Sequence, residues 1–172
     1  MFQDFKDLLS NLNASKVKYL IVGGYAVGFH AQPRVTKDLD LLVKPDAANA
    51  SALHKALTAF GAPVADITPA DLIERGKFFR FGRPPIAVDI LPEIDGVEFN
   101  AAWKPRVSMK IDESLSVYVI SDADLIAGKI AAGRPQDLAD VDALRRASQA
   151  RNVAPPAKRS APKKRPGKKR GQ

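Results

Sequence analysis

The composition of this 172-residue chain changes abruptly near residue 150, and that change limits how much of the chain can fold. From residue 151 to the end there are nine basic residues, four prolines and no acid, and no large apolar residue follows Val153. Such a segment buries too little apolar surface to offset the conformational entropy that folding removes. The sequence therefore predicts one folded domain over residues 1–150 and a disordered basic tail over residues 151–172.

The predicted tail also accounts for the charge of the chain. The 27 Lys and Arg residues outnumber the 19 Asp and Glu residues, so the formal net charge is +8. Since nine of the cations lie after residue 150, residues 1–150 carry 18 cations and all 19 acids, a net charge of −1. A near-neutral segment of this length suits a single domain with its own core. The basic tail would attract polyanions without reading their sequence.

Several classes of protein are excluded by what the sequence lacks. It has no cysteine, which excludes disulfides and thiolate metal sites and agrees with a reducing cytoplasm. The longest run free of strongly polar residues is 19–29, shorter than the roughly 18 to 20 residues that cross a bilayer. The first residues include acids where a secretion signal would be basic and then apolar. We expect a cytoplasmic protein without a membrane partner.

The order of predicted elements indicates an α/β (α+β) fold. Apolar periodicity and capping residues predict helices at residues 2–12, 24–31, 46–60 and 121–133, and a last helix that starts at Pro135. Short apolar runs predict strands at residues 18–23, 38–43, 77–81, 86–91, 97–99, 107–111 and 115–120, with a turn at 82–85. This order predicts a mixed sheet flanked by helices, with two helices at the C-terminal end of the domain.

A pair of carboxylates stands at the start of the second predicted strand. Asp38 and Asp40 follow the Gly23-Gly24 pair after thirteen residues. Side chains two apart on a strand point to the same face, so the two carboxylates would raise each other's proton affinity unless a cation lies between them. Magnesium prefers oxygen ligands and keeps positions for water and phosphate. The pair therefore predicts a Mg²⁺ site.

A third acid interrupts the apolar strand predicted at residues 86–91. Asp89 needs a polar partner if that strand lies inside the sheet. If the strand lies beside that of Asp38 and Asp40, the three carboxylates converge and could hold two metal ions about 3.5 to 4 Å apart. Exposure at a sheet edge or pairing with Arg80 would also account for Asp89, and the sequence leaves these alternatives open.

The glycine pair predicts contact with phosphate. Gly23 and Gly24 join a predicted strand to a predicted helix, and a helix that starts this way presents bare N–H groups at its positive end. The P-loop pattern is excluded, because Phe29 stands where its lysine is required.

Three cations are candidates for neutralising phosphate. Arg34 and Lys37 flank the predicted site, and Lys129 lies on the predicted helix face of Leu125. The sequence leaves open that Arg34 and Lys37 are ordinary surface charges. It also leaves open that Lys129 has a structural or solvated role. Asp137 and Asp140 would share one helix face, where pairing with Arg134 or Arg80 is favoured over metal binding.

These motifs together resemble a known superfamily. Residues 22–30 (VGGYAVGFH), followed by Arg34, Thr36, Asp38 and Asp40, resemble the motif of the DNA polymerase beta-like nucleotidyltransferases. The chain is most similar to the bacterial branch that contains AbiEii-like toxins of type IV toxin-antitoxin systems and related small nucleotidyltransferases. A C-terminal helical element of that branch resembles this chain at Leu125, Lys129, Arg134, Asp137 and Asp140.

The resemblance implies an activity as well as a fold. It implies transfer of a nucleoside monophosphate from an NTP such as ATP to an acceptor hydroxyl, with release of pyrophosphate. It assigns the metal ions, of which such enzymes bind two, to Asp38 and Asp40. It makes Asp89 the third carboxylate, which is a metal ligand or the general base. It places the turn that binds the triphosphate at Gly23 and Gly24. RNA or tRNA is an implied acceptor, and an antitoxin an implied partner. Two departures from the pattern are Gly24 for a serine and Gln136 for a lysine.

Two alternative functions agree with the same residues. The domain could be a catalytically degenerate transferase that binds nucleic acid or protein, with the tail contacting the polyanion. It could also modify a small molecule, as aminoglycoside nucleotidyltransferases do. Three clustered acids favour an enzyme, because a pure binding module has little use for mutually repelling carboxylates.

Overall fold

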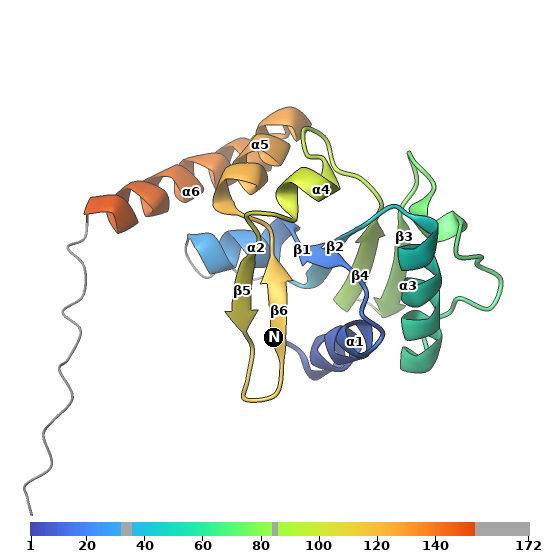
Figure 1. Cartoon of the computed structure of the whole chain (residues 1–172). Coiled ribbons are helices and arrows are strands. Elements are labelled where there is room, and N and C mark those ends of the chain that lie inside the picture. Colours follow the sequence, from blue (N-terminus) through green and yellow to red (C-terminus); the bar gives the residue numbers. More distant parts are fainter. Residues whose placement is uncertain (32–35, 84–85, 154–172) are drawn as a thin grey trace, which may run out of the picture.

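The computed structural model describes residues 1–31, 36–83 and 86–153 (Figure 1). In chain order the elements are α1 (Gln3–Ala14), β1 (Tyr19–Ile21), α2 (Gly23–His30), β2 (Asp38–Val43), α3 (Ala47–Phe60), η1 (Asp71–Ile73), β3 (Phe79–Arg83), β4 (Ile86–Leu91), α4 (Phe99–Ala102), β5 (Val107–Lys110), β6 (Ser116–Val119), α5 (Asp122–Ala132) and α6 (Pro135–Val153). None of the helices within these ranges is both long and apolar enough to span a bilayer.

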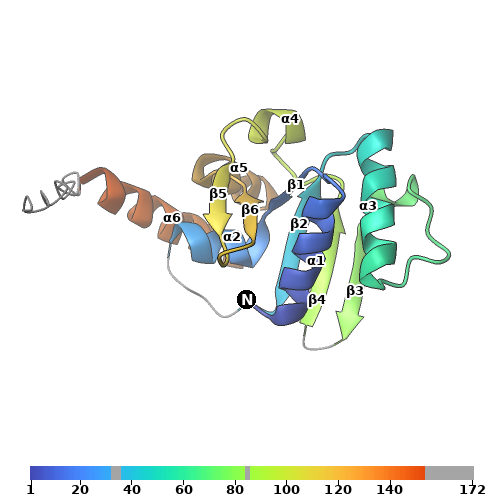
Figure 2. The same cartoon turned by 60° about the horizontal axis from the view of Figure 1, so that its bottom comes forward.

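The six strands form one mixed sheet in the order β3-β4-β2-β1-β6-β5. β2 pairs with β4 and β1 with β6 in parallel, whereas the other neighbouring pairs are antiparallel. Helices α1 and α3 pack against each other, and α2, α5 and α6 form a second group of contacting helices (Figure 2). The predicted α/β (α+β) class, a mixed sheet flanked by helices, is confirmed.

Local sequence signals set the ends of several helices. The Asp46 side chain accepts the Asn49 N–H at 2.8 Å and caps α3, which ends at Gly61 with φ of 88°. Ser121 caps α5 by accepting the Asp124 N–H at 3.1 Å. These side-chain acceptors satisfy N–H groups that the first helical turn leaves unpaired, and glycine adopts the left-handed conformation at low cost. Both predicted helix starts are confirmed.

Strand β2 shows how the fold separates core from site. Leu39 and Leu41 are fully buried, while Asp38 and Asp40, which alternate with them, are only partly buried. Alternate side chains of a strand point to opposite faces, so one face of β2 belongs to the hydrophobic core and the other carries the acids.

The strand predicted at residues 97–99 is wrong. Val97 makes only an isolated bridge with Ile94, and Phe99 begins the short helix α4. The Glu98 carboxylate accepts the N–H groups of Asn100 and Ala101 at 2.9 and 2.7 Å. This helix cap outweighs the strand preference of an apolar pattern only three residues long. The turn predicted at 82–85 also starts later than expected, because β3 continues to Arg83.

Helix α6 continues to Val153, three residues past the domain boundary predicted at residue 150. Arg151 donates from Nη1 to the His30 carbonyl and from Nη2 to Asp122 at 2.6 Å, and so ties α6 to the end of α2 and the start of α5. These tertiary contacts hold Arg151 in the helix, and the composition of residues 151–172 does not predict them. The rest of the predicted tail, 154–172, lies outside the described residues, as do Arg34 and residues 84–85.

Candidate active site

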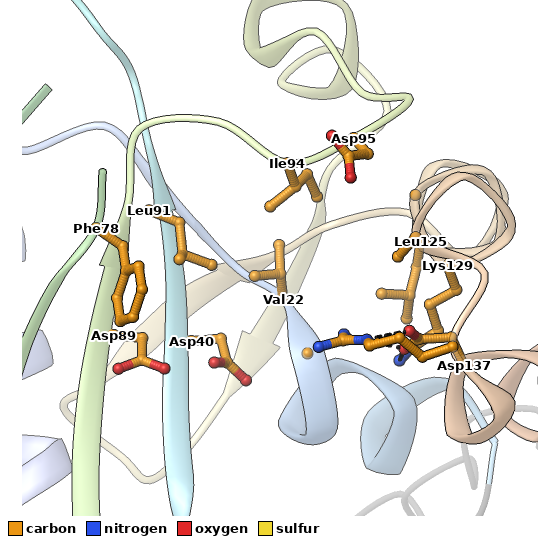
Figure 3. Close-up of a pocket in the computed structure, with 14 residues that line it drawn as sticks. Val22, Asp40, Phe78, Asp89, Leu91, Ile94, Asp95, Leu125, Lys129 and Asp137 are labelled. Atoms are coloured by element: carbon orange, nitrogen blue, oxygen red, sulfur yellow. Dashed lines mark hydrogen bonds and ion pairs between the residues drawn. The ribbon is translucent and has the colours of Figure 1, made fainter. Parts of the chain in front are cut away.

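The fold brings the three predicted acids to one face of the sheet. β2 and β4 are parallel neighbours, and in their register Asp40 lies opposite Asp89 and Asp38 opposite Ala87. Residues in register on neighbouring strands point to the same face, so all three carboxylates share it. Asp40 and Asp89 line a pocket of about 480 Å³ between the sheet and helices α5 and α6 (Figure 3).

Arg80 joins two of these acids. It lies opposite Asp89 in the β3–β4 register, where its Nε donates to Asp89 at 2.7 Å and its Nη2 to Asp38 at 2.9 Å. The alternative in which Asp89 pairs with Arg80 is therefore confirmed, and it occurs together with the convergence of the acids. Arg80 binds one oxygen of each carboxylate, and the cluster of three acids and one cation keeps an excess of negative charge.

The position of Asp40 among these groups raises the pKa of its carboxyl group. Burial, together with the nearby charges of Asp89 and Asp38, raises the pKa of Asp40 to about 6, although a hydrogen bond from the Gly24 N–H and the charge of Lys129 oppose the shift. Both raising effects disfavour the ionised carboxylate, and a bound cation would relieve them. A cation close to Asp40 would therefore stabilise its ionised carboxylate.

The glycine pair is required by the packing around these acids. Gly23 has φ of 59°, and a Cβ there would lie 1.9 Å from Asp40 Oδ2. A Cβ at Gly24 would lie 2.7 Å from Thr36 Oγ1, which explains why a serine could not stand at this position without moving Thr36. Gly23 lines the pocket of the acids, whereas Gly24 lines a second pocket on the side of Thr36.

The predicted phosphate-binding cations have different surroundings. Lys129 lines the pocket, yet its side chain is only 11% exposed and its Nζ bonds to Asp137 at 2.9 Å and to Asp140 at 2.8 Å. Lys129 therefore has two structural partners, and its contact with phosphate stays a prediction. Lys37 is exposed and lies outside the described lining of the pocket.

Arg134 is a pocket cation that the sequence did not suggest as a phosphate-binding residue. Its Nε donates to Asp137 at 2.5 Å, and its side chain remains 76% exposed while lining the pocket. Burial raises the pKa of Asp137, but hydrogen bonds from Arg134 and Lys129 outweigh it and hold that pKa below its usual value. The only signal for Arg134 in the sequence was its place in the C-terminal helical motif.

The opposite end of the pocket is apolar, a feature that the sequence did not reveal. Phe78 and Leu91 line it on the side of β3 and β4, and Phe78 is 60% exposed (Figure 3). The pocket therefore has an acidic floor, a cationic side at the helices and an apolar side at the sheet edge.

The donor set suits a hard divalent cation. Asp38, Asp40 and Asp89 offer only carboxylate oxygens, the ligands that Mg²⁺ prefers, and burial together with the neighbouring acids raises the pKa of Asp40. Among the described residues, no group of three His, Cys, Asp or Glu side chains is arranged so that it could hold a metal ion as it stands.

Comparison with known proteins places the chain in a family. Residues 1–149 match the family described as "Nucleotidyltransferase of unknown function (DUF6036)". None of the curated proteins matches the chain in sequence. The family match covers the whole described fold up to the last turn of α6, including all the pocket residues. The chain therefore belongs to this nucleotidyltransferase family.

Proposed function

We propose that this protein transfers a nucleoside monophosphate from an NTP to an acceptor hydroxyl and releases pyrophosphate, with Mg²⁺ held by Asp40 together with Asp38 and Asp89. The observation that carries the proposal is the alignment of these acids on one face of β2 and β4. Phosphoryl-transfer sites act mainly by positioning their substrates and by stabilising charge, and clustered carboxylates provide both through bound metal.

When bound, Mg²⁺ would neutralise the carboxylates and the phosphate oxygens that meet in the pocket. The residues of the chain hold it there through Asp40, whose carboxylate is fixed by the Gly24 N–H, and through oxygens of Asp38 and Asp89 that Arg80 shares. Because Arg80 is half-exposed, its guanidinium has room to leave one carboxylate as the metal arrives.

The triphosphate is proposed to lie on the helical side of Asp40. The N-terminus of α2 opens onto the pocket at Gly23, and Arg134 offers an exposed guanidinium there. Asp137 holds Arg134, and Lys129 holds Asp137. Lys129 is therefore a positioning residue, and Arg134 is the cation expected to contact phosphate.

Asp89 is proposed to act on the acceptor side of the reaction. Its strand β4 lies on the far side of β2 from β1, which leads into α2. A carboxylate in this place can accept the proton of the acceptor hydroxyl if it lies within hydrogen-bond reach. Its side chain is 13% exposed, so it is accessible from the pocket.

Acceptor and biological role are proposed from chemistry and resemblance. A polyanionic acceptor such as RNA or tRNA fits the nine cations of residues 151–172, which would raise its local concentration. A cytoplasmic toxin controlled by a cognate antitoxin agrees with the resemblance to AbiEii-like proteins. A gene for such an antitoxin beside that of this protein would support this role, and its absence would oppose it.

The test is a labelled-NTP screen with Mg²⁺ against total RNA, total protein and aminoglycosides. We expect Asp40→Asn and Asp38→Asn to lower transfer at least about a hundredfold, because each removes a proposed metal ligand. Asp142→Asn is the matched control, since Asp142 is exposed on α6 and belongs to a second Asp-x-Asp whose side chains diverge on a helix. Full transfer by Asp40→Asn would contradict the proposed site.

A further inference from the structure

The exposed ring of Phe78 belongs to the same face of the sheet as the acids. Arg80 faces Asp89 across the β3–β4 register, and Phe78 precedes Arg80 by two residues. The alternate residues Phe79 and Phe81 point to the other face, where Phe81 is buried against Phe60 of α3 with ring centroids 6.3 Å apart. Two of the three phenylalanines therefore face the α3 side, and the third is presented to the pocket.

The order of groups across the pocket assigns this apolar end to the acceptor. Gly23 at the α2 N-terminus lies against Asp40, whereas Asp89, Phe78 and Leu91 lie together on the side of Asp40 away from the helices (Figure 3). Displacement at the α-phosphorus needs the attacking and leaving oxygens roughly in line. If pyrophosphate leaves on the α2 and Arg134 side, the acceptor oxygen approaches from the side of Asp89, and the group that bears it lies against Phe78.

The surroundings of Phe78 indicate the chemistry of that group. Residues 75–83 (RGKFFRFGR) contain four cations and no acid, interleaved with aromatic residues, and β3 is the first strand in the order of the described sheet. Arg75 is 88% exposed and pairs with Glu93, and Lys77 is 66% exposed and pairs with Glu74. Exposed pairs of this kind contribute little to stability, so phosphate groups can replace the acids at small cost.

Cations on an edge strand also discourage pairing with other sheets, but that function does not require an exposed aromatic ring in the pocket of Asp40 and Asp89. A cationic track with an aromatic platform is the arrangement that binds single-stranded nucleic acid. We infer that Phe78, with Arg75 and Lys77, forms the acceptor subsite and takes the terminal nucleoside of a single-stranded polynucleotide. Its base stacks on Phe78, and its neighbouring phosphates contact the two cations.

This inference rests on the proposed function for the chemical step. The hydroxyl oxygen of the terminal nucleoside forms a bond to the α-phosphorus of the NTP, and the bond from that phosphorus to the bridging oxygen of the β-phosphate breaks. Pyrophosphate leaves with the bonding electrons, and the hydroxyl proton passes to the Asp89 carboxylate. The polynucleotide grows by one nucleotide, without an oxidant or reductant.

The test uses the full chain and a twelve-nucleotide single-stranded RNA with 2-aminopurine at its 3′ end, whose fluorescence falls when the base stacks. Phe78→Ala should weaken the binding that quenches the probe about tenfold or more, and Phe78→Trp should retain it. Phe2→Ala is the matched control, because Phe2 is 43% exposed and precedes α1, outside the pocket lining. Equal quenching by Phe78→Ala and Phe2→Ala overturns the inference.

Further arms separate this inference from the proposed function. A probe with internal 2-aminopurine should be quenched less than the 3′-terminal probe, and equal quenching would show that an end is not recognised and would overturn the inference. A deoxyribonucleotide version tells RNA from DNA, and quenching of either supports a nucleoside subsite. If Phe78-dependent quenching occurs but Asp40→Asn and the unaltered protein both lack transfer, the subsite stands and the proposed function fails. Transfer to protein or aminoglycoside that Phe78→Ala leaves unchanged overturns the subsite alone.

Discussion

Two clusters of charged residues face each other across the pocket, and they differ in balance. The sheet cluster contains three acids and one cation, namely Asp38, Asp40, Asp89 and Arg80. The helix cluster contains two acids and two cations, namely Asp137, Asp140, Lys129 and Arg134. In the sheet cluster the pKa of Asp40 is raised to about 6, whereas in the helix cluster the pKa of Asp137 is lowered.

This difference in charge balance distinguishes a structural network of ion pairs from a site with excess negative charge. In the helix cluster Lys129 and both acids are almost fully buried, and their mutual attraction offsets the cost of removing them from water. In the sheet cluster one cation cannot balance three acids. A cation bound from solution would relieve the remaining repulsion between the carboxylates. Charge balance therefore distinguishes the cluster that holds α5 to α6 from the one that we expect to bind metal.

Removal of the buried lysine should have the largest effect on stability. Lys129→Met leaves Asp137 and Asp140 buried without their shared cation, and we expect the free energy of unfolding to fall by about 3 to 5 kcal/mol. Urea unfolding measures this change. Lys55→Met, at an exposed position inside α3, is the control and should change it by less than about 0.5 kcal/mol. A similar small change in Lys129→Met would show that the helix cluster is not a structural network.

Removal of an acid from the sheet cluster should raise the free energy of unfolding instead of lowering it. Asp40→Asn removes a carboxylate that burial and two acids disfavour, while its amide oxygen can still accept the Gly24 N–H. At pH 8 in EDTA we expect the variant to be more stable than the unaltered protein by about 2 kcal/mol, although it should lose transfer activity. Asp142→Asn should leave stability within about 0.5 kcal/mol. Destabilisation by Asp40→Asn would contradict the charge imbalance.

The stability gain of Asp40→Asn should depend on pH. Between the ordinary pKa of 3.8 and the raised value of about 6, folded Asp40 binds more protons than the unfolded chain does. Its contribution to stability therefore falls as pH rises through this window and stays constant above it. In EDTA, the difference in unfolding free energy between Asp40→Asn and the unaltered protein should grow from about pH 4 to pH 6 and then level off. Parallel pH profiles would rule out a raised pKa at Asp40.

The smallest effect on stability, and a distinct effect on metal binding, is expected at Arg80. The Arg80 side chain is half-exposed, although Asp89 is 13% exposed, so Arg80→Gln should lower the free energy of unfolding less than Lys129→Met does. Because the variant adds net negative charge to the sheet cluster, its affinity for Mn²⁺ should rise about tenfold, equivalent to about 1.4 kcal/mol. Titration calorimetry measures this, with exposed Arg83→Gln as the control on the same strand. Weaker Mn²⁺ binding by Arg80→Gln would mean that Arg80 organises the site instead of competing for it.

Sequence patterns predicted those parts of the fold that depend on neighbours in the chain. The caps at Asp46 and Ser121 and the shared face of Asp38 and Asp40 follow from spacings of two or three residues, and all are found in the structure. The prediction failed at residues 97–99, where the cap from Glu98 outweighed a short apolar pattern. Local patterns predict well where one signal dominates and poorly where two compete within a few residues.

Other features of the site could not be predicted because they depend on contacts between distant segments. The two alternatives for Asp89, convergence with the other acids and pairing with Arg80, were equally consistent with its sequence, and the structure contains both. Lys129 could be recognised as a structural cation only once α6 brought Asp137 and Asp140 to it. The exposure of Phe78 depends on which face of the sheet α3 covers.

By itself the sequence determined that a near-neutral segment of mixed α/β structure precedes a basic segment, because composition and short-range periodicity carry that information. That a glycine pair and an Asp-x-Asp belong to its chemistry is a prediction from the same sequence. Only the tertiary structure decided which acids meet and which cations balance them. Strand order and helix packing join residues far apart in the chain, and electrostatic free energy depends on distance and burial in space.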